Sequence, residues 1–173
     1  MTLLDRVVAV LDANRTPCAL IDAAALAAAG VARSSYDVDL LTVDTSVLQP
    51  EPWAVLPAEG VLVDLRHGDA DDPPRGVVRI EAPSQRPVDV IVGKHAWQAR
   101  AIERASRPPA GPPIVLPRDL VLLKLYAGGT RDFWGIRDLL QLLGGRGVAA
   151  DVEADLDGLP RFMRERWMQV RRP

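Results

Sequence analysis

A chain of 173 residues with 48% hydrophobic and 25% charged residues has the composition of a globular protein with one sizeable core. Its net charge of -2 gives no overall attraction to nucleic acid or to a membrane surface, and its single cysteine, Cys18, excludes an intramolecular disulfide. No apolar run approaches the roughly 20 residues that span a bilayer, so we expect a soluble protein of the reducing cytoplasm.

The first half of the chain alternates between helical and extended patterns. Apolar residues follow the spacing of an amphipathic helix over 3–13. The alanine-rich run that follows predicts a helix over 23–29, with Asp22 as its N-cap and Gly30 at its end. A further helix is expected near 45–57. Short apolar runs predict strands at 17–21, 38–43, 61–66, 76–80 and 87–92.

The pattern becomes helical after residue 93. We expect helices over 94–105, 117–127 and 131–143, and two short helices in the last 25 residues, with a proline-rich connector at 107–113. The predicted fold class is α/β (α+β): a mixed sheet flanked by helices, with a helical C-terminal third. Residues 1–106 would form the α/β core and 107–173 a helical region packed on it as one compact unit.

Two acids stand at the start of the strand in "ARSSYDVDLLTVD". Asp37 and Asp39 are two positions apart, so they point to the same face of the strand and repel each other. They are either a solvated strand end or part of a divalent-cation site. A phosphatase or sugar-transferase D-x-D motif is disfavoured, because in those motifs the apolar strand precedes the acids. A third acid, Asp89, lies between apolar residues in "RPVDVIVG" and favours the metal site.

Three carboxylates from neighbouring strands could hold a pair of metal ions roughly 3.5–4 Å apart, an arrangement used in phosphoryl transfer. Such a site needs a phosphate-binding turn nearby. The strand-to-helix junction "ALIDAAAL" is the candidate, since a helix N-terminus presents free N–H groups to anions.

These segments together resemble the polymerase-β-like nucleotidyltransferase fold. The family pattern is a strand, a glycine turn and a helix, followed by roughly G-x-x-R-x-T-x-D-x-D, and here it reads "LIDAAALAAAGVARSSYDVDLL". "VDVIVG" resembles the strand that carries the third acid. "DLVLLKLYAGGTRDFWGIRDLL" is similar to the K-L-x-A…R-D-x-x-D-I segment of small bacterial members, which include abortive-infection-type toxins of toxin–antitoxin systems.

The resemblance implies a transfer of a nucleotide from an NTP to a hydroxyl acceptor. It assigns Mg²⁺ (or Mn²⁺) to Asp37, Asp39 and Asp89, of which Asp89 would also deprotonate the acceptor. It assigns the triphosphate to Arg33, to Ser34 or Ser35, and to Lys124. Asp132 would orient Lys124 or the substrate.

Two positions depart from the family pattern. Asp22 stands where the turn glycine is expected, and Gly135 replaces the second acid of R-D-x-x-D. A carboxylate in the turn repels a triphosphate. The alternative hypothesis is therefore a degenerate, non-catalytic module of this fold that binds a partner.

The acceptor is suggested only by local charge and by the resemblance. The C-terminal "PRFMRERWMQVRRP" carries five arginines and one glutamate, which fits either an RNA backbone or a solvated helix face. The resemblance implies tRNA or other RNA as acceptor and a cognate antitoxin as partner. A hydroxyl on a protein or on an aminoglycoside-like molecule also fits.

Overall fold

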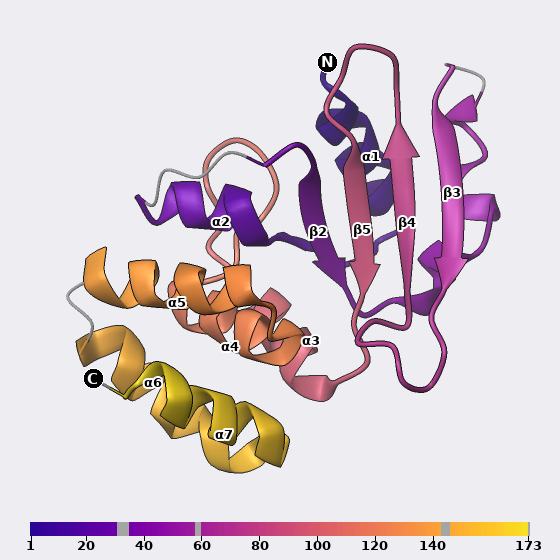
Figure 1. The fold of residues 1–173 in the computed structure, drawn as a ribbon. Helices are drawn as coiled ribbons and strands as arrows, with labels where there is room; N and C mark the ends of the chain where they lie inside the picture. The colour runs from indigo at the N-terminus through magenta and orange to yellow at the C-terminus, as the bar shows by residue number, and fades with distance from the viewer. Residues whose placement is uncertain (31–34, 58–59, 143–145, 173) are drawn as a thin grey trace.

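The computed structural model describes residues 1–30, 35–57, 60–142 and 146–172. Within them a five-stranded sheet has the order β1-β2-β5-β4-β3 (Figure 1). The strands are β1 (Ala19–Leu20), β2 (Val38–Thr42), β3 (Leu62–His67), β4 (Gly76–Glu81) and β5 (Val88–Val92). The helices are α1 (Leu3–Ala13), α2 (Asp22–Ala28), α3 (Ala96–Glu103), α4 (Pro117–Ala127), α5 (Thr130–Leu142), α6 (Arg146–Asp155) and α7 (Arg161–Val170).

The sheet is mixed, and its one parallel pair lies at the centre. β2 runs parallel to β5, whereas the pairs β1–β2, β5–β4 and β4–β3 are antiparallel. Successive side chains of a strand point to opposite faces. The parallel pairing therefore fixes which residues of β2 and β5 lie side by side, although the two strands are far apart in the sequence.

One face of the sheet is closed by α1 and by the segment between β2 and β3. Apolar residues of β2, β4 and β5 pack there against α1 and Trp53, whose indole N–H donates to the carbonyl of Val47 at 2.7 Å. Figure 1 shows α1 behind the sheet. Every second residue of these strands points to this face and is apolar, as Leu40, Val78 and Val90 are.

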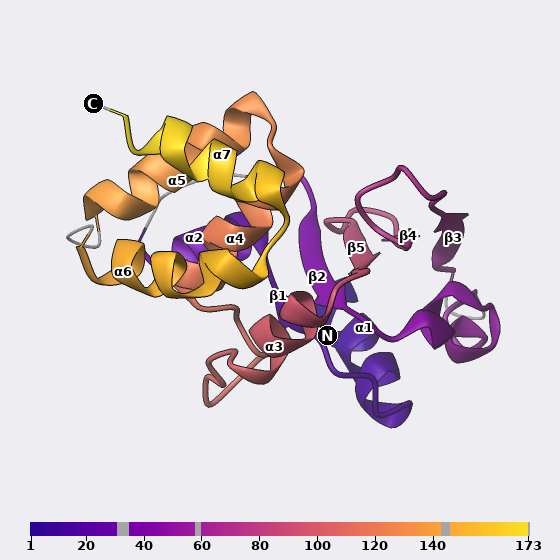
Figure 2. The same ribbon diagram turned by 90° about the horizontal axis from the view of Figure 1, so that it is seen from below.

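The second core joins the helices to the other face near β1 and β2. α4 is its centre, and α2, α5, α6 and α7 all pack against it (Figure 2). Leu41 of β2 enters this core. These five helices, α2 and α4 to α7, are called the helical group. In Figure 1 the helical group lies beside β2, and no described helix crosses the front of β3 and β4. The polar residues of that face, such as Asp64 and Glu81, are consequently exposed or half-exposed.

An ion network joins the helices to one another. The fully buried Asp119 of α4 accepts a hydrogen bond from Arg104, at the end of α3. Arg104 also lies 3.3 Å from Asp155 of α6, which in turn accepts from Arg118 of α4 at 2.5 Å. Burial raises the pKa of Asp119, while the guanidinium of Arg104 opposes that shift. The pairing compensates a carboxylate that would be costly to bury alone.

Most of the predicted elements are confirmed, within a few residues at their ends. The helix expected over 45–57 is wrong. The segment contains two short 3₁₀ helices, η1 (Thr45–Leu48) and η2 (Glu51–Trp53). Pro50 and Pro52 lack the N–H groups that a continuous helix would need.

The predicted capping role of Asp22 is also wrong. Ile21 is the N-cap of α2, and Asp22 is the first helical residue, with a φ of 49°. That left-handed conformation is uncommon for a residue other than glycine. No helix of the described residues is both long and apolar enough to cross a membrane.

Candidate active site

A row of charged residues crosses the second face of the sheet, from β2 beside the helices to the exposed strand β3. Asp39 of β2 lies directly opposite Asp89 of β5, Asp89 lies opposite Arg79 of β4, and Arg79 lies opposite Asp64 of β3. Asp37 stands two residues before Asp39 and therefore shares its face. The sheet register thus brings the three predicted acids to one surface.

Arg79 lies between two of these acids. Its Nη1 atom donates to both carboxylate oxygens of Asp89, at 3.1 and 2.9 Å, and lies 3.7 Å from an oxygen of Asp37. Its Nε donates to Glu81 at 2.9 Å. Arg79 was not predicted as a site residue from the sequence. The signal was a single arginine inside the apolar strand "GVVRI", but its partners depend on a register that the sequence does not reveal.

The three acids have different electrostatic environments. Burial, followed by repulsion from neighbouring carboxylates, raises the pKa of Asp39 to about 7. Burial also raises the pKa of Asp89, although Arg79 opposes this. The pKa of Asp37 is lowered, mainly because the hydroxyl of Ser35 donates to its carboxylate at 2.7 Å. The ionised form of Asp39 is consequently the least stable of the three, and a nearby cation would stabilise it most.

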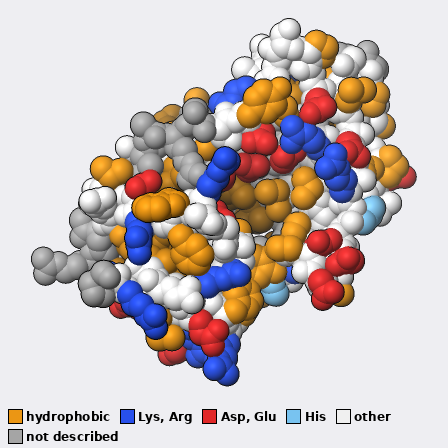
Figure 3. Space-filling view, in the orientation of Figure 1, with side chains coloured by type: hydrophobic (Ala, Val, Ile, Leu, Met, Phe, Trp, Pro, Cys, Tyr) orange, Lys and Arg blue, Asp and Glu red, His pale blue; other side chains and the backbone are white. Residues whose placement is uncertain are grey.

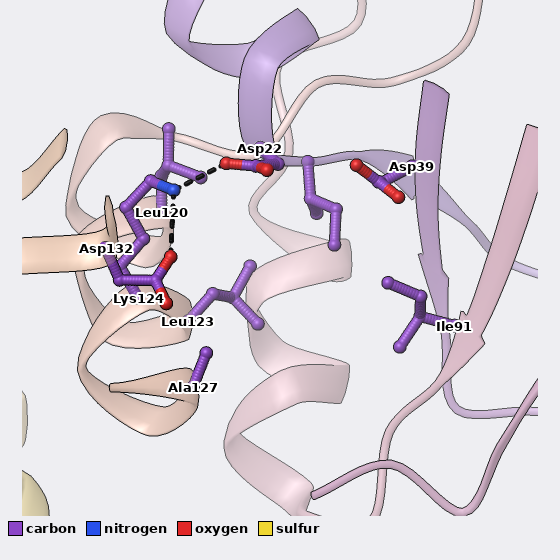
Figure 4. A pocket seen from close by; sticks show the side chains of 9 residues that line it. Asp22, Asp39, Ile91, Leu120, Leu123, Lys124, Ala127 and Asp132 are labelled. Carbon is purple, nitrogen blue, oxygen red and sulfur yellow. Dashed lines mark hydrogen bonds and ion pairs between the residues drawn. The ribbon is translucent and has the colours of Figure 1, made fainter. Parts of the chain in front are cut away.

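Lys124 on α4 is buried beside these acids. Its side chain is only 4% exposed, and its Nζ lies 2.5 Å from Asp22 and 3.3 Å from Asp132 (Figure 4). Asp132 in turn accepts from the backbone N–H of Gly129, a local contact that closes the first turn of α5. Figure 4 shows Asp22 between the lysine and Asp39. The predicted Lys124 and Asp132 are therefore adjacent, and Asp22 neutralises the lysine.

Two neighbouring cavities open at this point. The first has a volume of about 200 Å³ and an apolar wall that includes Ile91, Leu120 and Leu123. The second, of about 650 Å³, includes Ser35 and Asp37. Both are lined by Asp22 and Asp132. Figure 3 shows a hollow with an apolar floor and charged side chains around it, between the helical group and the sheet.

The chemistry of the three carboxylates fits a hard divalent ion, because Mg²⁺ and Mn²⁺ prefer oxygen ligands. As the described side chains stand, no three acids, histidines or cysteines are gathered closely enough to enclose a metal ion. Asp37 and Asp89 instead face the guanidinium of Arg79. The donor set is suitable, and a basic side chain lies within it.

The remaining predicted site residues are Arg33, Ser34 and Ser35. Arg33 and Ser34 lie outside the described residues. Ser35 contacts Asp37 through its hydroxyl, and its carbonyl accepts from Arg86 at 2.8 Å. Gly135 is buried within the helical group, so the second acid of the family pattern has no counterpart there.

The comparisons with known proteins concern the fold. No protein-family model and no curated protein matches the chain. Among solved structures, the solution structure of the antibiotic-resistance factor ANT(2'')-Ia matches with a TM-score of 0.56 and 17% identity over 90% of each chain. A crystal structure of ANT(2'')-Ia in complex with adenylyl-2''-tobramycin matches with a TM-score of 0.57 and 18% identity, over 95% of this chain and 97% of the other. The predicted fold class is confirmed: the chain has a mixed α+β fold, a five-stranded sheet flanked by helices, and shares this fold with ANT(2'')-Ia.

Proposed function

We propose that this protein transfers a nucleotide from an NTP to a hydroxyl acceptor, with Mg²⁺ or Mn²⁺ held by Asp37, Asp39 and Asp89. The observation that supports this best is the sheet register, which puts Asp39 and Asp89 side by side next to a cavity that contains a buried lysine. A bound divalent ion would supply positive charge to the phosphate oxygens and activate the attacking oxygen.

The protein groups have separable roles in this proposal. The apolar wall of the smaller cavity offers a contact surface for the nucleoside, and Lys124 offers a positive charge for the phosphates once it is released from Asp22. We still predict further phosphate contacts from Ser35, and from Arg33 and Ser34, which lie outside the described residues. Burial raises the pKa of Asp89, which makes its carboxylate a better base for the acceptor hydroxyl.

For the acceptor, a small polyhydroxyl compound of the aminoglycoside type is the first choice, because one structural neighbour carries an adenylylated tobramycin. An RNA acceptor, tRNA ends included, and a toxin paired with an antitoxin rest on the sequence alone. One arginine of α7 already has partners inside the protein: Arg166 donates to the carbonyls of Leu125 and Tyr126, both at 2.7 Å. It is therefore less available to an RNA backbone. The proposed compartment is still the cytoplasm.

The decisive experiment is a transfer assay with each labelled NTP, Mg²⁺ or Mn²⁺, and three acceptor classes: aminoglycosides, bulk tRNA and total protein. Asp39→Asn and Asp89→Asn should each lower labelling at least a hundredfold. Asp64→Asn is the matched control, since Asp64 ends the same row but is exposed and paired with Arg66. Labelling that survives Asp39→Asn, or no labelling with any acceptor, counts against the proposal.

A second candidate is the non-catalytic binding module. It is favoured by one observation: Asp22 already neutralises the lysine that should meet the triphosphate. Calorimetry with NTP and Mn²⁺ separates the two functions. Tight, metal-dependent NTP binding eliminates the purely scaffolding role, and a complete lack of it, in a folded protein, eliminates the enzyme.

A further inference from the structure

The guanidinium of Arg79 occupies the space that faces two of the proposed metal ligands. A single nitrogen, Nη1, contacts both oxygens of Asp89 and approaches Asp37. The side chain of Arg79 is 25% exposed and that of Asp89 15% exposed, so the pair is partly shielded from water. Charge-assisted hydrogen bonds of this kind are stronger than neutral ones, and partial burial reduces their screening.

A divalent ion and this guanidinium need the same oxygens at different distances. The nitrogen lies about 3 Å from the oxygens of Asp89, whereas Mg²⁺ requires oxygen ligands at roughly 2.0–2.1 Å. A metal ion shared by Asp37 and Asp89 would stand where Nη1 stands now, and two cations at one point repel each other. The guanidinium therefore has to leave before these two carboxylates can close around a metal ion.

The neighbouring residues provide a place for the displaced side chain. Glu81, two residues along β4, accepts from Nε of Arg79 at 2.9 Å and is half exposed. This contact does not involve Nη1. Because the side chain of Glu81 is half exposed, it can move together with the rigid guanidinium, so Arg79 can keep this partner after it leaves the two acids.

We propose that Arg79 is a tethered counter-cation that competes with the divalent ion for Asp37 and Asp89 and so sets the metal affinity of the site. The inference rests on the metal site of the proposed function. It adds that two of the three acids, Asp37 and Asp89, bind metal in exchange for an internal guanidinium. Without metal, Asp89 and, at a longer distance, Asp37 are paired with the positive charge of Arg79.

The test is Mn²⁺ binding to the full chain, measured by the electron paramagnetic resonance signal of free Mn²⁺ without any substrate. Arg79→Gln should bind Mn²⁺ at least tenfold more tightly than the wild-type protein. Arg66→Gln is the matched control, because Arg66 lies on the same face and acts on Asp89 only through its field. It should change the affinity less than threefold.

The outcomes separate this inference from the proposed function. Unchanged or weaker Mn²⁺ binding by Arg79→Gln overturns the counter-cation role and leaves the metal site standing. Equal tightening in Arg79→Gln and Arg66→Gln also overturns it, since a general field effect would then suffice. If neither the wild-type protein nor any variant binds Mn²⁺, the metal-dependent function fails, and the inference fails with it.

A second variant guards against a folding defect in Arg79→Gln. Arg79→Lys keeps a positive charge, but an ammonium lacks the planar fork that contacts Asp89 and Glu81 together. It should tighten Mn²⁺ binding by a smaller factor, about threefold, while circular dichroism confirms the fold. Wild-type affinity in both folded variants overturns the proposal.

Discussion

Lys124 of α4 and Asp22 at the start of α2 form an ion pair of 2.5 Å, although 102 positions separate them in the sequence. The pair joins the helical group to the turn that opens the candidate site. A buried ammonium needs a counter-charge, and Asp22 provides it from a left-handed backbone conformation that glycine would adopt more easily. The same carboxylate stands where an anionic ligand would reach the lysine.

The first prediction concerns this turn. Asp22→Gly relieves the positive φ and frees Lys124 from one of its two carboxylates. We expect NTP binding in the presence of Mn²⁺ to tighten by about tenfold, because a charge-assisted hydrogen bond becomes available to the phosphates. Calorimetry measures the affinity, and the transfer rate should rise with it if the protein is an enzyme.

Asp22→Asn is the control for the charge alone. Asparagine tolerates the left-handed conformation but carries no charge, so it should give most of the gain. An affinity that stays at the wild-type level in both variants would show that Asp22 does not oppose nucleotide binding.

The second prediction concerns the lysine itself. Lys124→Met keeps a long apolar chain but leaves Asp22 and Asp132 without their shared cation. We expect a loss of about 1–3 kcal/mol in the free energy of unfolding, since both carboxylates are only partly exposed. Urea unfolding at pH 7 measures the loss. Lys94→Met is the control, because among the described residues the Lys94 ammonium contacts exposed loop carbonyls and no carboxylate. Lys94→Met should lose less unfolding free energy than Lys124→Met. A larger loss in Lys94→Met would contradict the role of Lys124 as the shared cation of two carboxylates.

The third prediction is a pH dependence caused by Asp39. Its pKa is raised to about 7, above the value of 3.8 for an unperturbed aspartate. The folded state therefore binds the proton more strongly than the unfolded state. The contribution of Asp39 to the free energy of unfolding is full near and below pH 4, falls between about pH 4 and pH 7, and is constant above pH 7.

Asp39→Asn tests this sign. Without metal and at pH 8, the variant should be more stable than the wild-type protein by on the order of 1–3 kcal/mol, and the difference should shrink toward pH 4. Urea unfolding in the presence of a chelator gives both values. A difference that is constant with pH, or that has the opposite sign, would mean that Asp39 is not strained by burial.

The fourth prediction concerns the ion network between the helices. Asp119→Ala removes the partner of Arg104 from a fully buried position. We expect a loss of about 2–4 kcal/mol in the free energy of unfolding, because the partly buried guanidinium of Arg104 loses its nearest carboxylate and is left with the 3.3 Å contact to Asp155. Thermal unfolding compares it with Asp151→Ala, whose carboxylate is exposed and lies 3.9 Å from Arg118. Equal melting temperatures for the two variants would remove the structural role of Asp119.

The strands and most helices were predictable because each depends on a local pattern. Short apolar runs located β3, β4 and β5, and Pro117 at the first helical turn located the start of α4. The prediction of one helix over 45–57 was wrong, because the apolar spacing of this segment resembles that of a helix while its prolines prevent one.

The site was predictable only in part. The acids were found as separate motifs, and the register that unites them follows from a parallel pairing between distant strands. Arg79 and the ion pair of Asp22 were missed, because both depend on partners that only the folded chain brings together. A capping role for Asp22 was the local interpretation, and the tertiary contact with Lys124 prevailed over it.

The parallel pairing of β2 and β5 also bears on how such a protein can change in evolution. Asp39 and Asp89 are positioned by a backbone ladder, so the loops around the site can be exchanged or lengthened for new substrates without disturbing the acids. The same ladder is intolerant of indels within either strand. Removing one residue from β5 before Asp89 would shift the alternation by one step and turn that carboxylate into the apolar core beneath the sheet.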